Sequence, residues 1–96
     1  MYLYVIENCD NGLVKIGHSL DPDRRCASLQ TGSSADLRVA HRAAVDPARA
    51  AVLERKLHQE MAHVRVRGEW FSLDAKLAAN LVEHCVIRWH DDILLD

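Results

Sequence analysis

Aromatic and aliphatic residues gather near the start of the chain in the alternating pattern that is typical of strands. One run covers residues 2–6 and a second covers residues 13–17, and the Asn11-Gly12 step between them is a strong signal for a hairpin turn. Because side chains alternate across a strand, Tyr4 shares a face with the residues two positions before and after it. The pattern predicts an antiparallel hairpin at the N-terminus.

A third alternating run follows at residues 37–43. Apolar residues and His41 occupy every second position, and Arg38 and Arg42 lie between them. The pattern predicts a third strand with one basic face.

Three later segments change to the spacing of a helix, with apolar residues three or four positions apart. Asp21-Pro22 and Asp46-Pro47 are helix start signals, since Asp caps a helix N-terminus and Pro suits its first position. Asp74 can cap the last helix in the same way. The expected buried stripes are Cys26 and Leu29, then Ala50, Leu53, Leu57, Met61 and Val64, and finally Leu73, Leu77, Leu81, Cys85 and Trp89.

These elements predict an α/β fold of the α+β kind. A small three-stranded antiparallel sheet would be flanked by three helices, in the order β-β-α-β-α-α. The 96 residues leave room for one hydrophobic core, so we expect a single domain over residues 1–96. Its C-terminal helix is expected at about residues 74–90.

The composition places the chain among ordinary globular proteins, with 49% hydrophobic and 27% charged residues. Its apolar stretches are too short to span a membrane, and its start lacks the features of a signal peptide. The three widely spaced cysteines, Cys9, Cys26 and Cys85, make a poor disulfide framework. We therefore expect a cytoplasmic protein with reduced thiols and no membrane partner.

The net charge of −2 argues against a strongly basic nucleic-acid-binding protein, but it conceals an asymmetry. Residues 1–68 carry ten Lys or Arg against eight Asp or Glu, whereas residues 69–96 carry two against six. A local cationic surface is therefore available in the first 68 residues, with the acidic last helix turned away from it.

Five polar residues fall on the predicted elements in a combination that suits the hydrolysis of a phosphodiester. They are Tyr4 and Lys15 on the paired strands, His18 after the second strand, Arg25 on the first helix, and Glu54 on the second helix, near its apolar stripe. A carboxylate can bind a hard divalent cation, and an arginine can bind the phosphate. A tyrosine whose pKa is lowered by the neighbouring lysine, or which is paired with the histidine, can take a proton from the attacking water.

Simpler interpretations exist for the same residues. Tyr4 is compatible with ordinary strand packing, and Arg25 with an ion pair to Asp21 one helical turn earlier. Glu54 and His58 are four positions apart, so they can form a plain hydrogen bond or two ligands of a transition metal such as zinc. No third ligand for such a metal is apparent from the sequence.

Short motifs built from these residues resemble the GIY-YIG nuclease superfamily. Tyr2-Leu3-Tyr4 resembles the first signature element. The resemblance is closest to the phage-type branch of T5orf172 and Mug113-like domains, through an ordered set of motifs within about residues 2–73. The set is Lys15-Ile16-Gly17, Arg24-Arg25, Gln30-Thr31-Gly32, Glu54 with Leu57-His58, and Gly68-Glu69-Trp70-Phe71.

The resemblance implies cleavage of DNA at one active site that uses a divalent metal ion, Mg²⁺ or Mn²⁺. It makes Tyr4 the candidate general base and Glu54 the metal ligand. It makes Arg25 the phosphate contact, and Arg24 and Lys15 further candidates for contacts with the nucleic acid. His18 lies just past Lys-Ile-Gly, where some members place a histidine near the general base.

Two positions depart from the family pattern. Lys15 replaces the second signature tyrosine, and it can either lower the pKa of Tyr4 or bind the phosphate itself. Many members carry an asparagine after the metal-binding glutamate, and Glu69 is the residue near that distance. Gly17 and His58 are expected to support the site.

Trp70 and Phe71, at the end of the last motif, are expected to close the core. The motifs favour a metal-dependent DNA endonuclease. The alternative is a non-cleaving nucleic-acid-binding or regulatory module that keeps the fold, and a third option is an interaction domain that docks through its acidic last helix. The sequence leaves open the oligomeric state and the existence of a protein partner.

Overall fold

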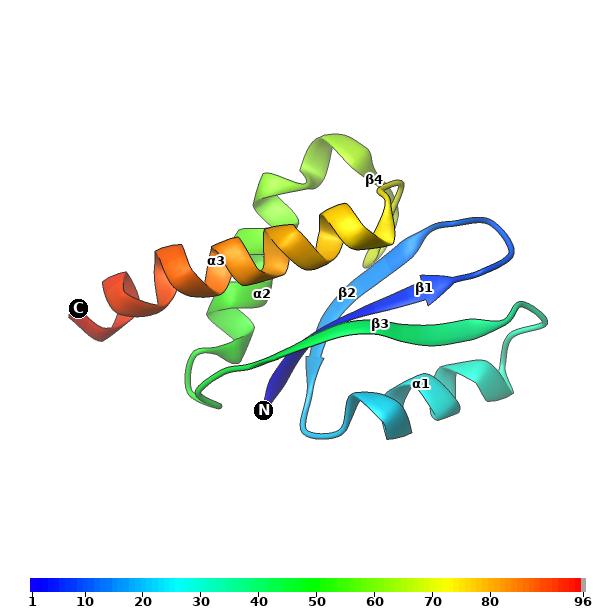
Figure 1. Ribbon diagram of the computed structural model, residues 1–96, viewed down its shortest axis with the longest axis horizontal. Helices are drawn as coiled ribbons and strands as arrows, with labels where there is room; N and C mark the ends of the chain where they lie inside the picture. Colours follow the sequence, from blue (N-terminus) through cyan, green and yellow to red (C-terminus); the bar gives the residue numbers. More distant parts are fainter. Residues whose placement is uncertain (96) are drawn as a thin grey trace.

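The predicted hairpin is present and lies at the centre of the sheet (Figure 1). The computed structural model describes the backbone of residues 1–95 and the side chains of residues 1–89. Strand β1 (Tyr2–Asn8) pairs antiparallel with β2 (Val14–Ser19), which includes His18 within the strand. In the turn, Gly12 has a φ of 76°, a left-handed conformation that glycine adopts without strain.

Helix α1 (Pro22–Thr31) covers one face of the sheet, over β1 and β3 (Figure 1). It begins as predicted, because the side chain of Asp21 accepts a hydrogen bond from the backbone N–H of Arg24 at 3.1 Å. The buried Cys26 of this helix packs against Tyr4 and Ile6 of β1. The face of β1 that carries Tyr4 is therefore the α1 face.

Strand β3 (Leu37–Ala44) pairs with the outer side of β1, but its basic residues do not share one face. A bulge interrupts the β1–β3 register in the middle of the strand. Before the bulge Arg38 binds Glu7, and after it Arg42 binds Asp23 of α1 on the other side of the sheet. The single basic face expected from the sequence is wrong, because a bulge shifts every later side chain to the opposite face.

The sheet has five antiparallel strands in the order β3-β1-β2-β5-β4, so the predicted three-stranded sheet is wrong. The added strands β4 (Arg65–Arg67) and β5 (Trp70–Phe71) form a small hairpin, and Gly68 in its turn has a φ of 54°. The order of elements becomes β-β-α-β-α-β-β-α. Strands of three and two residues are too short to show an alternating pattern.

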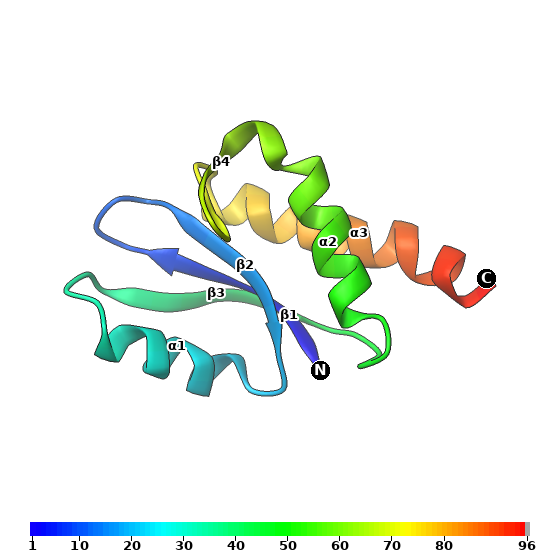
Figure 2. The same cartoon turned by 180° about the vertical axis from the view of Figure 1, so that it is seen from behind.

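Helices α2 (Ala50–Glu60) and α3 (Ala75–Leu95) lie on the face of the sheet opposite α1 (Figures 1 and 2). The stripe predicted for α2 is confirmed, since Leu53, Leu57 and Met61 are buried against the sheet. The helix begins later than the Asp-Pro signal suggests, because residues 46–49 form a turn before it. A short 3₁₀ turn (Ala62–Val64) then leads into β4.

Helix α3 buries Cys85 as predicted, and Leu73, Leu81 and Trp89 pack partly buried against the core, but smaller residues take the place expected for Leu77. Ala75, Ala78, Val82 and Cys85 face the core, while Leu77 is 48% exposed. Small side chains let the helix approach the sheet closely, whereas the prediction followed the larger residues. The helix continues beyond residue 90 to Leu95, and the side chains of its acidic end lie outside the described residues.

The predicted N-terminal cap of α3 is confirmed, since Asp74 accepts hydrogen bonds from the backbone N–H groups of Lys76 and Leu77, at 2.9 and 3.2 Å. Among the helices that the structure describes, none combines the length and the apolar character needed to cross a membrane.

Candidate active site

Two carboxylates and one imidazole gather beside β2, where α2 passes the edge of the sheet. Glu54 and His58 are one turn apart on α2, and Glu69 comes from the turn between β4 and β5. One ligand atom from each of the three side chains lies within 4.8 Å of the other two. All three residues are half-buried. This Glu–His–Glu group is a candidate metal centre, with two oxygen ligands and one nitrogen ligand.

The ring of His58 is held in a defined orientation. Its Nε2 lies 2.8 Å from the carbonyl oxygen of Ile16 in β2, and the ring packs against Phe71 with 5.1 Å between the centroids. A carbonyl oxygen can only accept, so Nε2 carries the hydrogen. In the neutral ring Nδ1 then has the lone pair that can bind a cation.

His18 binds Glu54 across the same edge. Its Nδ1 lies 2.9 Å from Oε1 of Glu54, and the side chains are 34% and 19% exposed respectively. A carboxylate has two oxygens and several lone pairs, so Glu54 can accept this hydrogen bond and bind a cation at the same time. The histidine therefore orients the carboxylate as an outer ligand partner does in many metal sites.

Lys15 forms an ion pair with Glu69 at 2.7 Å between Nζ and Oε2. The lysine side chain is only 9% exposed, and a buried ammonium group requires such a partner. The sequence interpretation gave Lys15 two other roles, lowering the pKa of Tyr4 or binding phosphate. In this structure its charge is engaged with the carboxylate of the Glu–His–Glu group.

The side chain of Tyr4 lies over Gly17 on the neighbouring strand, its Cα partner in the β1–β2 register. A Cβ atom placed on Gly17 would lie 2.5 Å from the Tyr4 hydroxyl oxygen and 2.7 Å from the ring carbon that carries it. Both distances are shorter than any normal contact. Glycine is therefore required at position 17 for a steric reason, and this explains its place in the Lys-Ile-Gly motif.

The Tyr4 hydroxyl has a perturbed acidity. Burial raises the pKa of Tyr4 above its ordinary value, and the negative charges of Glu69 and Glu54 raise it further, whereas the hydrogen bond from Arg25 and its positive charge lower it. The net shift is upward, and Lys15, whose charge is paired with Glu69, is not among its causes. The Tyr4 hydroxyl is therefore close enough to Arg25, Glu54 and Glu69 for each of the three charges to change its pKa.

The two arginines of α1 differ in position. Arg25 reaches the hydroxyl of Tyr4, and both Arg24 and Arg25 line a surface hollow of about 290 Å³ at the start of α1. Ser19 and Ser28 contribute hydroxyl groups to the same hollow. The acidic Asp21 also lines this hollow, so the two arginines leave it with an excess of one positive charge, and Arg25 connects it with the tyrosine.

The fold brings together eight of the nine residues selected from the sequence. They are Tyr4, Lys15, Gly17, His18, Arg25, Glu54, His58 and Glu69. Arg24 lies in the hollow beside Arg25. The sequence selected Glu69 only as the residue near the family asparagine position and did not place it beside His58 as a third ligand, because the β4–β5 hairpin is what carries Glu69 back to β2. Gly68, directly before Glu69, is the sequence signal that indicates the turn of this hairpin.

Trp70 does not close the core with Phe71 as the sequence suggested. Phe71 is fully buried among the residues between the sheet and helices α2 and α3, whereas Trp70 pairs with Lys15 and points to the other face. Neighbouring residues of a strand face opposite sides, so only one of the two can join that core.

Comparison with known proteins gives one family. The model of the T5orf172 domain matches residues 1–90, which confirms the family resemblance found in the motifs. No curated protein and no solved structure matches the chain. The match indicates a nuclease-like domain, in agreement with the candidate metal centre beside β2.

Proposed function

We propose that this chain, which belongs to the T5orf172 domain family, is a metal-dependent endonuclease that hydrolyses phosphodiester bonds of DNA. The observation that supports this most strongly is that two groups of side chains lie close together along the edge of β2. One is the Glu–His–Glu group on the α2 side, and the other is the Tyr4 hydroxyl with Arg25 on the α1 side. Phosphodiester hydrolysis needs both a cation site and a phosphate contact.

The metal would be held by Glu54, His58 and Glu69. When bound, a divalent cation stabilises the charge on the leaving oxygen and offsets the two negative charges that raise the pKa of Tyr4. Carboxylate oxygens favour Mg²⁺ and Mn²⁺, and the imidazole nitrogen shifts the preference toward Mn²⁺. We therefore expect higher activity with Mn²⁺ than with Mg²⁺.

The chain's own residues supply the remaining steps. Arg25 donates to the non-bridging oxygens of the phosphate and stabilises the charge that develops on them. Tyr4 is the candidate general base: once its own hydroxyl proton has left to solvent, the phenolate oxygen can take a proton from the attacking water. His18 and Lys15 act as positioning residues, since His18 holds Glu54 and Lys15 holds Glu69.

A second candidate function, a DNA-binding module without cleavage, is favoured by one observation. The raised pKa of Tyr4 keeps its hydroxyl protonated at neutral pH in the metal-free protein. If no cation binds next to it, the tyrosine can donate a hydrogen bond to a phosphate but cannot accept a proton.

Plasmid nicking separates the two functions. Supercoiled plasmid is incubated with the protein and either Mn²⁺ or Mg²⁺, and the relaxed form is quantified over time. We expect the wild type to nick the plasmid, and Glu54→Gln and Arg25→Ala each to lower the rate by about 100-fold or more. Salt-sensitive DNA binding without nicking in either metal would favour the binding module instead.

The chain offers matched controls for both variants. Glu83 on α3 binds His41 much as Glu54 binds His18, and Arg38 on β3 binds Glu7 away from Tyr4. Glu83→Gln and Arg38→Ala should keep the wild-type nicking rate within about twofold, because exposed ion pairs contribute little to stability. Equal losses in control and site variants would contradict the proposed site.

A further inference from the structure

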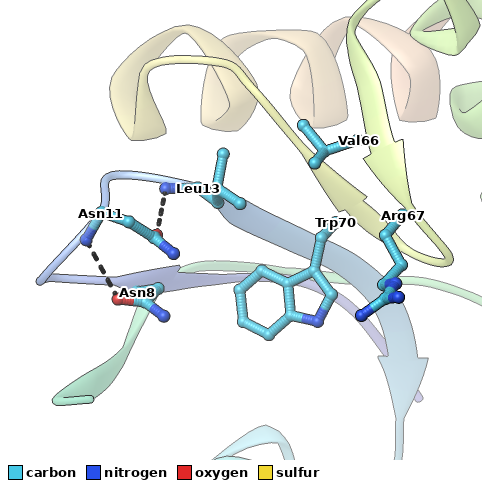
Figure 3. Close-up of a pocket in the computed structure, with 6 residues that line it drawn as sticks. All are labelled: Asn8, Asn11, Leu13, Val66, Arg67 and Trp70. Atoms are coloured by element: carbon cyan, nitrogen blue, oxygen red, sulfur yellow. Dashed lines mark hydrogen bonds between the residues drawn. The ribbon is translucent and has the colours of Figure 1, made fainter.

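A surface pocket of about 490 Å³ lies between the β1–β2 turn and the β4–β5 hairpin, outside the site described above (Figure 3). Its lining residues are Asn8, Asn11, Leu13, Val66, Arg67 and Trp70. The indole of Trp70 lies between Asn8 and Arg67 (Figure 3). Val66, which is 56% exposed, adds an apolar side chain to the lining. The pocket has the size and the aromatic lining of a site for a planar ring.

The polar groups of this pocket are hydrogen-bond donors. The side-chain oxygen of Asn8 accepts from the backbone N–H groups of Asp10 and Asn11, and that of Asn11 accepts from the N–H of Leu13. Since the oxygens face the turn, the amino groups of both asparagines are left to donate outward. The guanidinium of Arg67 can likewise only donate hydrogen bonds. A ligand that forms hydrogen bonds with these groups must offer acceptors, which cations and plain hydrocarbon groups lack.

The pocket is joined to the candidate active site through Lys15. In the β2–β5 register Lys15 is the partner of Trp70, so their side chains leave the sheet on the same face, which is also the face of Tyr4. The lysine Nζ lies 5.8 Å from the centroid of the Trp70 ring and 2.7 Å from the carboxylate of Glu69. The pocket therefore adjoins the Glu–His–Glu group through Lys15.

We infer that this pocket binds one unpaired nucleobase of the DNA substrate, with the base stacked on Trp70 and its carbonyl or ring-nitrogen acceptors facing Asn8, Asn11 and Arg67. The inference rests on the proposed function for the identity of the ligand as DNA. In a duplex both faces of each base are covered by its neighbours, so only a single-stranded or displaced base can stack on a protein ring. The substrate class is therefore DNA with a single-stranded segment beside the cleaved bond.

The direct test compares two overhangs that differ only in their bases. One duplex carries a single-stranded overhang of ordinary nucleotides, and the other carries an overhang of the same length made of abasic residues. Binding is measured by fluorescence anisotropy with a chelator present, so that cleavage plays no part. Because the phosphates are the same in both, we expect the ordinary overhang to bind about 5- to 100-fold more tightly, from base stacking alone.

Variants assign that preference to the pocket. Trp70→Ala should abolish it and Arg67→Ala should reduce it, whereas Arg65→Ala, on the same strand but outside the pocket, should retain it. Because Trp70 and Trp89 are the two tryptophans of the chain, Trp89→Phe leaves Trp70 as the only indole. Its fluorescence should be quenched by the ordinary overhang and not by the abasic one, a result that needs no substitution in the pocket.

Two results would overturn the inference: equal binding of both overhangs by the wild type, or a preference that survives in Trp70→Ala. If the plasmid is nicked but the overhangs bind equally, the pocket assignment fails and the nuclease proposal stands. If no DNA binds and no plasmid is nicked, both fail.

Discussion

Two glutamate–histidine pairs connect a helix to the sheet through hydrogen bonds of similar length, the first at Nδ1 of its histidine and the second at Nε2. Glu54 of α2 binds His18 of β2 at 2.9 Å, and Glu83 of α3 binds His41 of β3 at 2.7 Å. The first glutamate side chain is 19% exposed and the second 50%. Among the residues whose side chains the structure describes, only the first pair has a second imidazole and a second carboxylate within reach, from His58 and Glu69.

The difference shows that the pair itself is an ordinary structural contact. We expect chemistry at only one of the two, because the β4–β5 hairpin and the β1–β2 register bring further groups to the same edge. Burial adds to this effect, since interactions between charges strengthen as water is excluded. We therefore expect a change at the β2 edge to alter activity or stability, and a matched change elsewhere in the fold to leave them nearly unchanged.

The largest effect is expected from a single methyl group at Gly17. Gly17→Ala would place a Cβ atom 2.5 Å from the Tyr4 hydroxyl oxygen and so displace the tyrosine. We expect nicking to fall by about 100-fold or more and the free energy of unfolding to fall by about 1–3 kcal/mol. Gly32→Ala is the control, because its nearest neighbour is 4.0 Å away. Similar activity in both variants would show that the position of Tyr4 does not matter.

Removing the two histidine partners should give the next largest contrast. His18→Ala releases Glu54 from its fixed orientation, and outer partners of metal ligands typically account for about 10- to 100-fold in metal affinity or activity. His41→Ala releases Glu83 and should leave nicking unchanged. The measurement is the nicking rate as a function of Mn²⁺ concentration, and parallel curves for the two variants would remove the distinction between the pairs.

The Lys15–Glu69 ion pair should be asymmetric in stability. Glu69→Gln leaves a buried ammonium group without its counter-charge and should lower the free energy of unfolding by about 1–3 kcal/mol. Lys15→Met leaves a carboxylate that is 38% exposed and can be hydrated, so we expect a loss below about 1 kcal/mol. Urea denaturation of both variants checks this. The reverse order would mean that Glu69, and not Lys15, is the residue that depends on the pair.

The smallest effect is the alkaline titration of Tyr4. The pKa of Tyr4 is raised in the folded protein, whereas the unfolded chain has the ordinary value near 10.0. The folded state therefore favours the protonated hydroxyl, and this contribution to stability is present below pH 10 and is lost as the pH rises through the folded-state value. Phenolate absorbance should show a late step that Tyr4→Phe removes. A late step that persists in Tyr4→Phe would contradict the assignment.

The sequence predicted the elements with strong local signals. The hairpin turn at Gly12, the caps at Asp21 and Asp74 and the stripe of α2 all depend on neighbours in the chain, and all are present. The five-stranded sheet could not be predicted, because β4 and β5 are stabilised by pairing with β2 and not by their own pattern. Likewise, the bulge of β3 and the small-residue stripe of α3 follow from tertiary packing.

The candidate site could also be predicted only in part from the sequence. Motif spacing selected its residues, but the contacts among them depend on the tertiary fold. The ion pair of Lys15 with Glu69, the hydrogen bond of His58 to Ile16 and the steric need for Gly17 all join different elements. The change in the Tyr4 pKa is also a tertiary effect, because burial is its largest cause.

Mn²⁺ binding separates the two glutamate–histidine pairs most directly, since the first belongs to the proposed metal centre and the second is a structural contact. Electron paramagnetic resonance detects the free ion, whose signal decreases when Mn²⁺ binds to protein. We predict one binding site per chain in the wild type and in Glu83→Gln, and loss of that site in Glu54→Gln. No binding by the wild type, or equal binding by the two variants, would contradict the proposed metal centre.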